Sequence, residues 1–318
     1  MNFLEAVPAA ASRIAVLVRE TPAQHSRFFS ELTGADVFLK LENLQYTGSF
    51  KLRGVSNCLL SLSKPDLQRG VITASSGNHG AAFSLALSRL GAKGSVYVPE
   101  NASSTKLDAI RLYGAEIILY GNDAGLAELQ ARKVAQEQGV SYISPYNDEA
   151  VIAGQGTIGF ELANQVENID AVYMSVGGGG LISGIGGYLK QLNPDIEIIG
   201  CMPENSPVMA KCAEAGKIVE WPVLPTLSDG TAGGIEPGAI TFDYCQRYVD
   251  DYVLVSEQEI RTAMCRFIDN EHMLLEGAAG VALAGLTRLA KRNAGKRVAV
   301  IICGANISRE TLLTVIRN

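Results

Sequence analysis

The stretch A-V-Y-M-S-V-G-G-G-G-L-I-S-G-I-G-G-Y-L-K-Q-L, residues 171–192, indicates the class of fold. Its first six residues form a short apolar run that predicts a buried strand, and four glycines then open a helix. Consecutive glycines can adopt positive φ and turn their N–H groups toward one point, where the helix dipole adds partial positive charge. The stretch therefore predicts a strand–loop–helix unit that binds a phosphate, in preference to a plain tight turn.

Two well-known phosphate motifs do not account for this loop. No Gly-Lys-Ser or Gly-Lys-Thr sequence follows the glycines, so the loop is not a P-loop. A dinucleotide site needs an acidic residue about 20 positions further on, at the end of a second strand. Asp195 instead falls in a turn after Asn193-Pro194. We therefore interpret the loop as an anion site of another kind.

Strands and helices alternate on both sides of this unit. Strands are expected within residues 36–42, 70–78, 94–100, 115–121, 140–147, 171–176, 197–203 and 298–304. Helices are expected within residues 2–18, 51–62, 79–91, 104–114, 123–139, 154–166 and 177–192. Such alternation is typical of parallel sheets covered by helices on both faces. We expect two α/β layers with a cleft between them.

The composition is that of a folded, acidic protein. Of the 318 residues, 47% are hydrophobic and 19% are charged, which suffices for two domains or one large α/β unit. A net charge of −6, without a long basic run, argues against a nucleic-acid partner. No apolar stretch reaches ~18 residues, so we expect no membrane span.

Cysteine and histidine usage restricts the compartment and the metal chemistry. The six cysteines form no C-x-x-C pair, which favours reduced thiols in a cytoplasmic protein over disulfides or a zinc site. The three histidines, at positions 25, 79 and 272, are too scattered for a histidine metal cluster. Arg13 interrupts the N-terminal apolar run and no basic segment precedes it, so we expect no signal peptide.

The motif S-F-K-L-R-G (49–54) places a lysine in unusual surroundings. A lysine at a loop–helix junction is most often a surface charge. Lys51, however, lies between the apolar residues Phe50 and Leu52. Lysine is the side chain that forms Schiff bases, and burial lowers its pKa so that the amine becomes nucleophilic.

The motif S-S-G-N-H-G (75–80) lies between an expected strand and an expected helix. Its side chains and backbone N–H groups predict a carboxylate site at a helix N-terminus. The residues concerned are Ser75, Ser76, Gly77, Asn78 and His79. An N-capped turn is the simpler alternative.

The motif C-G-A-N (303–306) closes the last apolar strand. Ligands of open α/β sheets lie at the carboxyl ends of the strands, which makes Cys303 a candidate site residue. A small buried cysteine without function is the alternative.

These four motifs occur in the order and approximate spacing of the pyridoxal-phosphate-dependent serine/threonine dehydratase family, which the chain resembles. That family includes the eukaryotic serine racemases and belongs to fold type II, the tryptophan-synthase β-like group. Further matching segments are Thr21-Pro22, K-L-E-N (40–43), V-I-A-G-Q-G-T-I-G-F-E (151–161) and L-L-E-G-A-A-G (274–280). The resemblance thus covers almost the whole chain.

The resemblance implies a role for each site residue. Lys51 would hold pyridoxal phosphate as a Schiff base, Phe50 would pack beside the pyridine ring, and Asn78 would bond the 3-oxygen of the ring. The phosphate would lie on Gly177, Gly178, Gly179, Gly180 and Leu181.

Three further cofactor residues follow from the same resemblance. Asn147 and Glu276 correspond to polar residues near the cofactor, although Gly277 replaces a proline after the glutamate. Cys303 falls where dehydratases usually carry serine, facing the pyridine nitrogen. A thiol is a poor acid, so it should leave that nitrogen unprotonated, which favours prompt β-elimination.

Two departures from the family pattern concern metal and substrate. Racemases carry carboxylates of a divalent-cation site at the positions of Met202 and Val208, and hard cations need oxygen ligands. We therefore expect no metal. The segment 226–242 carries glycines where racemases have polar residues, which leaves the identity of the substrate open.

The implied fold is α/β, with two open, twisted, mostly parallel sheets and helices on both faces. Pyridoxal phosphate would lie between a large domain (1–46 and 149–318) and a small domain (47–148), in a homodimer. About 14 residues follow Gly304, so we expect no C-terminal regulatory domain.

The implied activity is that of a lyase that removes water from a β-hydroxy amino acid and releases a 2-oxo acid and ammonia. Serine, threonine, 3-hydroxyaspartate, a phenylserine and an ectoine-derived amino acid remain open as substrates.

Three alternatives remain. A racemase would use Lys51 and Ser76 as bases on opposite faces of the substrate. A β-replacement or threonine synthase is disfavoured because Leu52, not aspartate, follows the lysine. A non-enzymatic phosphate-binding protein would need no buried lysine.

Overall fold

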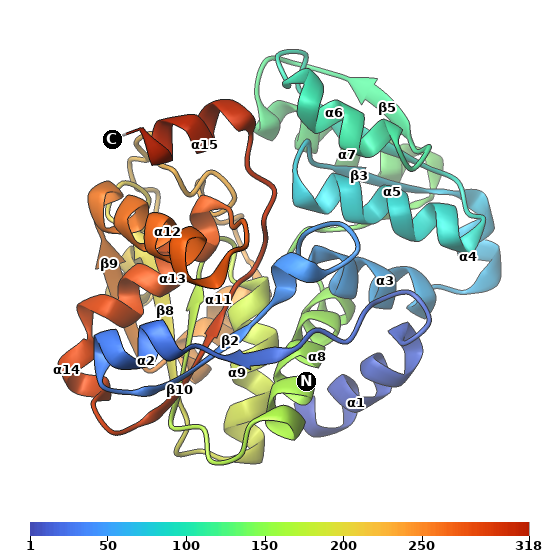
Figure 1. The fold of residues 1–318 in the computed structure, drawn as a ribbon. Helices are drawn as coiled ribbons and strands as arrows, with labels where there is room; N and C mark the ends of the chain where they lie inside the picture. The colour runs from blue at the N-terminus through green and yellow to red at the C-terminus, as the bar shows by residue number, and fades with distance from the viewer. Residues whose placement is uncertain (318) are drawn as a thin grey trace.

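The computed structural model describes residues 1–317 and contains two sheets (Figure 1). The larger sheet has the order β1-β2-β10-β7-β8-β9, in which only the β1–β2 pair is antiparallel. Its strands are β1 (Ala23–His25), β2 (Asp36–Lys40), β7 (Ala171–Ser175), β8 (Glu197–Pro203), β9 (Asp251–Val255) and β10 (Arg297–Ile301).

The smaller sheet is entirely parallel, with the order β5-β4-β3-β6. Its strands are β3 (Val71–Ala74), β4 (Gly94–Val98), β5 (Glu116–Leu119) and β6 (Ser141–Tyr142). Helix α7 packs on one face of this sheet and α5 on the other, and α3 packs on α5. The helices of this part are α3 (Lys51–Ser61), α4 (Lys64–Arg69), α5 (Asn78–Leu90), α6 (Ser104–Arg111) and α7 (Ala124–Gln138).

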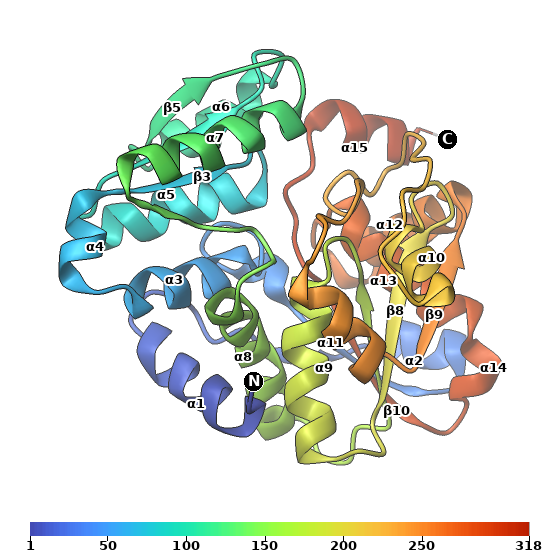
Figure 2. The same ribbon diagram turned by 180° about the vertical axis from the view of Figure 1, so that it is seen from behind.

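Helices also cover both faces of the larger sheet (Figure 2). Helix α13 packs on β7, β8, β9 and β10, and α12 packs on α13; helices α8 and α9 lie on the opposite side. This part contains α1 (Phe3–Ile14), α2 (Arg27–Thr33), the 3-10 helix η1 (Glu42–Leu44), α8 (Glu149–Gln165), α9 (Gly180–Leu192), α10 (Val208–Ala215), α11 (Ile240–Tyr248), α12 (Glu257–Glu271), α13 (Gly277–Arg288), α14 (Ala290–Asn293) and α15 (Arg309–Ile316).

The central strands explain the apolar runs in the sequence. All five residues of β7 are buried, because parallel strands covered on both faces need apolar side chains on both sides. Strand β10 lies between β2 and β7, so Val298 is in register with Val37 on one side and Ala171 on the other. The two ends of the chain therefore share one core.

The expected α/β class, with two mostly parallel sheets and helices on both faces, is confirmed. Each of the eight expected strands is present, although β6 has only two residues. Helix α8 begins at Glu149, five residues before the expected start, because the Asp148 side chain caps it by accepting a hydrogen bond from the Val151 N–H at 2.9 Å. The sequence analysis did not assign α2, α4, β1, β9 or α10 to α15.

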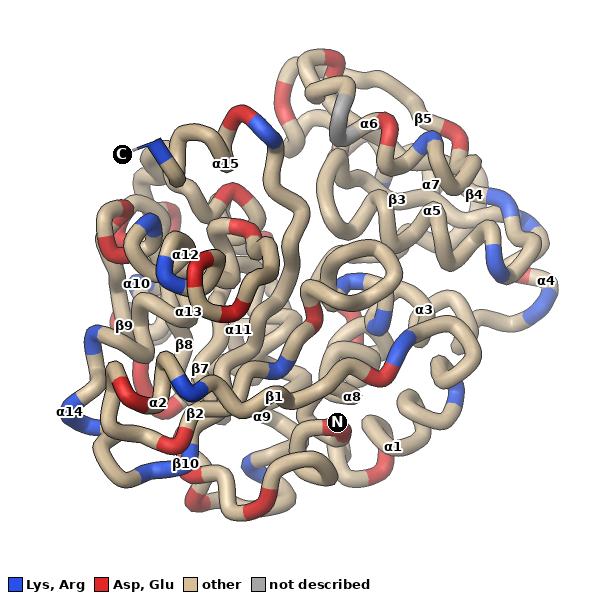
Figure 3. Tube along the Cα trace, viewed as in Figure 1, with Lys and Arg blue, Asp and Glu red and all other residues tan. Residues whose placement is uncertain are grey.

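Every strand of the smaller sheet comes from residues 71–142, and every strand of the larger sheet from outside that range. The domain boundaries at 46/47 and 148/149 stay a prediction. Basic and acidic residues intermingle along the trace in Figure 3. Within residues 1–317, no helix is both long and apolar enough to cross a membrane.

Candidate active site

A cleft of about 1010 Å³ lies between the two sheets. It brings together residues from all four motifs, including Lys51, the Ser75–His79 segment, the Gly177–Gly180 loop and Cys303. Most of these residues follow the carboxyl ends of strands β3, β7 and β10, where ligands of parallel sheets bind.

The glycine loop joins β7 to α9 and cannot accommodate side chains. A Cβ atom on Gly178 would lie 2.6 Å from the Tyr146 ring, and one on Gly177 would lie 3.0 Å from Thr231 Cα. Gly179 has φ +85°, in the left-handed region that favours glycine. Because α9 has 13 residues and begins at Gly180, its N-terminal N–H groups and its dipole face this loop. The loop is a cradle that fits a phosphate group.

Lys51 is the first residue of α3, and its amine faces the cleft. The Nζ atom donates a hydrogen bond to the backbone oxygen of Pro145 at 2.8 Å and lies 5.2 Å from the Phe50 ring centroid. Burial lowers the pKa of Lys51 to about 8, although Glu276 and Cys303 act in the opposite direction. About a tenth of the amine is therefore uncharged, and nucleophilic, at pH 7.

The loop before Lys51 is bound to the segment that contains Cys303. The Phe50 N–H donates to the Cys303 oxygen at 3.1 Å, and the Ala305 N–H donates to the Gly48 oxygen at 2.8 Å. An isolated β-bridge between Ser49 and Gly304 completes this contact. Two motifs that are about 250 residues apart in sequence are thus joined through their backbones.

Asn78 is the first residue of α5, and its amide meets a buried carboxylate. The Nδ2 atom donates to Glu276 Oε1 at 3.1 Å and to Oε2 at 2.9 Å, and Oδ1 accepts from Asn306 Nδ2 at 2.7 Å. The pKa of Glu276 is raised to about 7, chiefly by burial, with a smaller contribution from Asp229 and with the hydrogen bond from Asn78 acting in the opposite direction.

Cys303 is buried between a hydroxyl and that carboxyl group. Ser175 Oγ donates to the thiol at 3.6 Å, and the thiol donates to Glu276 Oε1 at 3.8 Å. Burial raises the pKa of Cys303 well above its usual value, so the thiol stays neutral at pH 7. The thiol can therefore contact a ring nitrogen without supplying a charge to it.

The Ser75–His79 segment forms one wall of the cleft, as the sequence suggested for a ligand-binding loop. The Gly77 N–H donates to Ser75 Oγ at 3.2 Å, which shapes the turn before α5. His79 Nε2 lies 2.9 Å from Thr73 Oγ1, inside the small sheet. Burial lowers the pKa of His79 to about 3, so the imidazole is a neutral core group.

The structure places Asn147 apart from the other expected cofactor residues. Asn147 does not line the cleft; its Oδ1 accepts the Ile240 N–H at 2.9 Å and thereby holds the start of α11. Its neighbour Tyr146 lies against the glycine loop instead, with its hydroxyl accepting the Glu236 N–H at 3.1 Å. The sequence alone gave no signal that Tyr146, and not its neighbour Asn147, would lie against the glycine loop.

Several cleft residues were not singled out from the sequence. Asp229 and Thr231 come from the segment 226–242, which was expected only to shape the substrate surroundings. Ser175 lies within the stretch 171–192 and Asn306 within the C-G-A-N motif, but the sequence analysis gave neither side chain a role.

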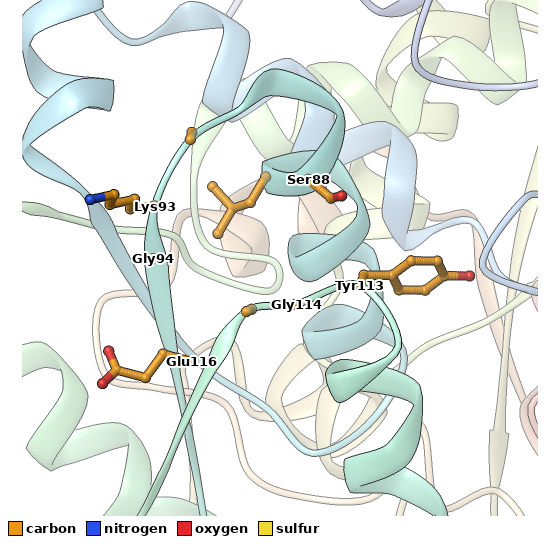
Figure 4. Close-up of a pocket in the computed structure, with 9 residues that line it drawn as sticks. Ser88, Lys93, Gly94, Tyr113, Gly114 and Glu116 are labelled. Carbon is orange, nitrogen blue, oxygen red and sulfur yellow. The ribbon is translucent and has the colours of Figure 1, made fainter.

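A second pocket lies at the amino ends of β4 and β5, beside the carboxyl end of α5 (Figure 4). Lys93, Gly94, Tyr113 and Glu116 are among its lining residues. In Figure 4, the Lys93 and Glu116 side chains lie on one side of strands β4 and β5, and the Tyr113 side chain lies on the other. These polar groups do not converge on a ligand position, so we assign no site there.

The geometry defines an α/β enzyme in which a buried amine and a phosphate cradle face one cleft. The family described as pyridoxal-phosphate dependent enzyme matches residues 14–304, and the chain belongs to this family. The phosphate cradle and the Lys51 amine fit that cofactor, which this protein uses.

Curated relatives within the family include L-threonine-converting enzymes. The chain is 38% identical over 308 residues to the L-threonine ammonia-lyase of Thermotoga maritima, covering 96% of this chain and 76% of the relative. It is also 38% identical over 300 residues to the catabolic L-threonine dehydratase of Escherichia coli, covering 94% and 91%.

Solved structures of both activity types are similar to this fold. Threonine deaminase isoform 2 of Solanum lycopersicum superposes with a TM-score of 0.94 at 33% identity, covering 99% of this chain and 92% of that chain. Maize serine racemase gives 0.93 at 32% identity, covering 98% and 95%.

Proposed function

We propose that this protein is a pyridoxal-phosphate-dependent dehydratase that acts on a β-hydroxy amino acid of the threonine or serine type. The reaction eliminates water from the substrate, and hydrolysis of the resulting imine takes up one water and releases a 2-oxo acid and ammonia. The observation that carries the proposal is the amine of Lys51, with a pKa near 8, facing the same cleft as the Gly177–Gly180 cradle. The threonine-converting relatives support the substrate class.

When bound, pyridoxal phosphate supplies the electron sink that stabilises negative charge at the substrate α-carbon. The chain's own residues orient the reacting groups. The Gly177–Gly180 loop holds the phosphate, and the Ser75–Asn78 turn offers N–H and hydroxyl donors to the substrate carboxylate. Lys51, which starts α3, holds or removes the α-proton through Nζ.

Cys303 and Glu276 set the charge on the ring side of the cleft. A neutral thiol at Cys303 does not hold the pyridine nitrogen protonated, which favours rapid loss of the β-substituent. The Glu276 carboxyl lies beside both Cys303 and Asn78 and fixes their orientation. We assign it a positioning role.

The test is a panel of β-hydroxy amino acids, each supplied as both enantiomers, with detection of the 2-oxo acid and of ammonia. The panel contains serine, threonine, 3-hydroxyaspartate and phenylserine. We expect stoichiometric 2-oxo acid and ammonia from at least one threonine- or serine-type substrate. Binding of pyridoxal phosphate without release of either product from any of them would overturn the proposal.

Racemisation is the second candidate activity, favoured by the similarity to maize serine racemase. It requires Ser76, on the wall of the cleft, to act as a base opposite Lys51. In that case Ser76→Ala abolishes racemisation and spares dehydration of the enantiomer that Lys51 deprotonates. If Ser76 only binds the carboxylate, the same change raises KM alone. Racemisation that persists at full rate in Ser76→Ala would rule out this role.

We also propose that the protein is a cytoplasmic homodimer. The reduced-thiol composition supports the compartment, and membership of the family supports the assembly. Light scattering of the purified holoenzyme checks the mass of the assembly, and fractionation of the native cells checks the compartment.

A further inference from the structure

Helix α8 lies between the two helices whose first turns carry the cofactor-binding groups (Figures 1 and 2). Lys51 is the first residue of α3, and Gly180, at the end of the phosphate cradle, is the first residue of α9. Helix α8 packs against both helices and contains the whole segment V-I-A-G-Q-G-T-I-G-F-E (151–161), to which the proposed chemistry assigns no role.

The contact between α8 and α3 is a contact of backbones. A Cβ atom on Gly154 would lie 2.6 Å from the Arg53 carbonyl oxygen and 2.7 Å from Gly54 Cα. Backbone atoms cannot rotate away from such a contact as a side-chain end can. The first turn of α3, with Lys51 in it, is therefore held at a fixed distance from α8.

The contact between α8 and α9 has the same character two residues further along. A Cβ atom on Gly184 would lie 2.3 Å from the Ile152 oxygen and 2.6 Å from the Gly156 nitrogen. A Cβ atom on Gly156 would lie 2.6 Å from Val7 Cγ2 of α1 and 3.0 Å from the Gly184 oxygen. The helix that begins at the phosphate cradle is therefore also in backbone contact with α8.

Two polar contacts also fix the orientation of α3. No side chain of Phe50 caps the start of α3. Gln155 of α8 instead binds the first turn, because its Oε1 accepts a hydrogen bond from the Gly54 N–H at 3.1 Å. The fully buried Arg53 donates to Glu161 Oε1 at 2.5 Å and to Oε2 at 2.8 Å. Both acceptors belong to α8, so α3 can neither slide nor rotate freely against it.

We infer that α8 sets the separation between the Lys51 amine and the phosphate cradle through the backbone contacts of Gly154 and Gly156. Pyridoxal phosphate has a rigid ring, so its aldehyde carbon and its phosphate lie at a nearly constant distance. The covalent bond to lysine forms only where the protein presents both groups at a matching distance. Gly154, Gln155 and Gly156 are then positioning residues. This inference rests on the proposed role of Lys51.

The test compares three Gly→Ala variants of α8. Gly154→Ala places a methyl group against the backbone of α3, and Gly156→Ala places one against the Val7 side chain and the Gly184 oxygen. Gly159→Ala meets Ile185 and Leu189 only at 3.4 Å and is the matched control. Each protein is titrated with pyridoxal 5′-phosphate and with pyridoxine 5′-phosphate, which has the same ring and phosphate but no aldehyde. Borohydride trapping and mass spectrometry then measure the fraction of protein with a covalent lysine adduct.

We expect Gly154→Ala and Gly156→Ala to lose about tenfold in affinity for pyridoxal phosphate relative to pyridoxine phosphate, a typical size for overpacking. The fraction of protein trapped as a covalent lysine adduct should fall together with this affinity. Gly159→Ala stays within about twofold of the wild type in both measurements. Equal losses for the two ligands in both test variants, or equal behaviour of test and control variants, would overturn the inference.

Far-UV circular dichroism and thermal unfolding of each apoprotein separate mispositioning from misfolding. If an alanine variant does not fold, Gln155→Met carries the same expectation, because it removes the acceptor for the Gly54 N–H at nearly unchanged volume. A wild-type protein that binds pyridoxal phosphate but forms no adduct at Lys51 would instead refute the proposed role of Lys51.

Discussion

The side-chain amide of Asn78 spans the carboxylate of Glu276, with Nδ2 at 3.1 Å from Oε1 and 2.9 Å from Oε2. This pair links the first residue of α5 to the residue that precedes α13, across the cleft between the two sheets. Neutral donors from Asn78, Asn306 and Cys303 only partly compensate the buried carboxylate, so the protonated form of Glu276 persists to about pH 7.

Glu276 should therefore make stability depend on pH. Its folded pKa of about 7 is above the reference value of 4.5, so the folded state retains a proton that the unfolded chain has lost between these pH values. The stabilisation is complete below about pH 4.5 and is lost as pH rises through 7, by roughly 3 kcal/mol in total. Glu276→Gln removes it.

Urea unfolding of both apoproteins at pH 5, 6, 7 and 8 checks this expectation. The difference in unfolding free energy, wild type minus Glu276→Gln, should fall from pH 5 to pH 7 and level off by pH 8. Parallel curves for the two proteins would show that Glu276 titrates as it does in water.

Lys51→Ala should abolish turnover and leave the apoprotein folded. The Lys51 side chain makes one hydrogen bond, to the Pro145 oxygen, so its removal costs little packing. The glycine cradle should still bind pyridoxal phosphate, without visible absorbance of a lysine Schiff base. Lys51→Arg is the control, since it keeps a cation at this position but no nucleophile. A borohydride-reducible adduct in Lys51→Ala would assign the Schiff base to another lysine.

Cys303→Ser should change activity only mildly, because both side chains are small and weakly acidic. Cys303→Asp should hold the pyridine nitrogen protonated and raise α-carbon deuterium exchange relative to elimination. Glu276 would oppose this, because its Oε1 lies 3.8 Å from the Cys303 sulfur and two carboxylates there share a proton.

The double variant Cys303→Asp/Glu276→Gln removes that competition and should raise the exchange ratio further. Deuterium incorporation and 2-oxo acid release are measured in the same reaction. A ratio that is unchanged in both variants contradicts the assignment of Cys303 to the ring nitrogen.

Magnesium, calcium and manganese should have no strong effect on activity. Met202 on β8 and Val208 at the start of α10 are 1% and 2% exposed, and apolar side chains cannot ligate hard cations. The holoenzyme is assayed after dialysis against a chelator and again after each ion is restored. A several-fold loss that one ion reverses would place a cation site elsewhere in the chain.

Local sequence was sufficient to predict the central strands and helices and to single out the four motifs that line the cleft. The apolar run of β7 indicated a buried strand, because a strand covered on both faces needs apolar side chains. The four glycines after it indicated a phosphate cradle, because such a cradle has no room for Cβ atoms. The Lys51 motif, in which apolar residues flank the lysine, likewise predicted a buried amine. The sequence analysis predicted no helix after residue 192, so the helices of the last third, such as α12, were not assigned.

Tertiary structure alone decided which polar groups meet. Asn78 and Glu276 are 198 positions apart, and their contact depends on how the two sheets face each other, which local periodicity does not encode. The same reason explains why Asn147 serves α11 while Tyr146 lies against the cradle. The sequence alone determined that the chain has an amine and a phosphate cradle. Only the packing of α8 against α3 and α9 decided the distance between them, because backbone contacts between helices arise from the whole fold.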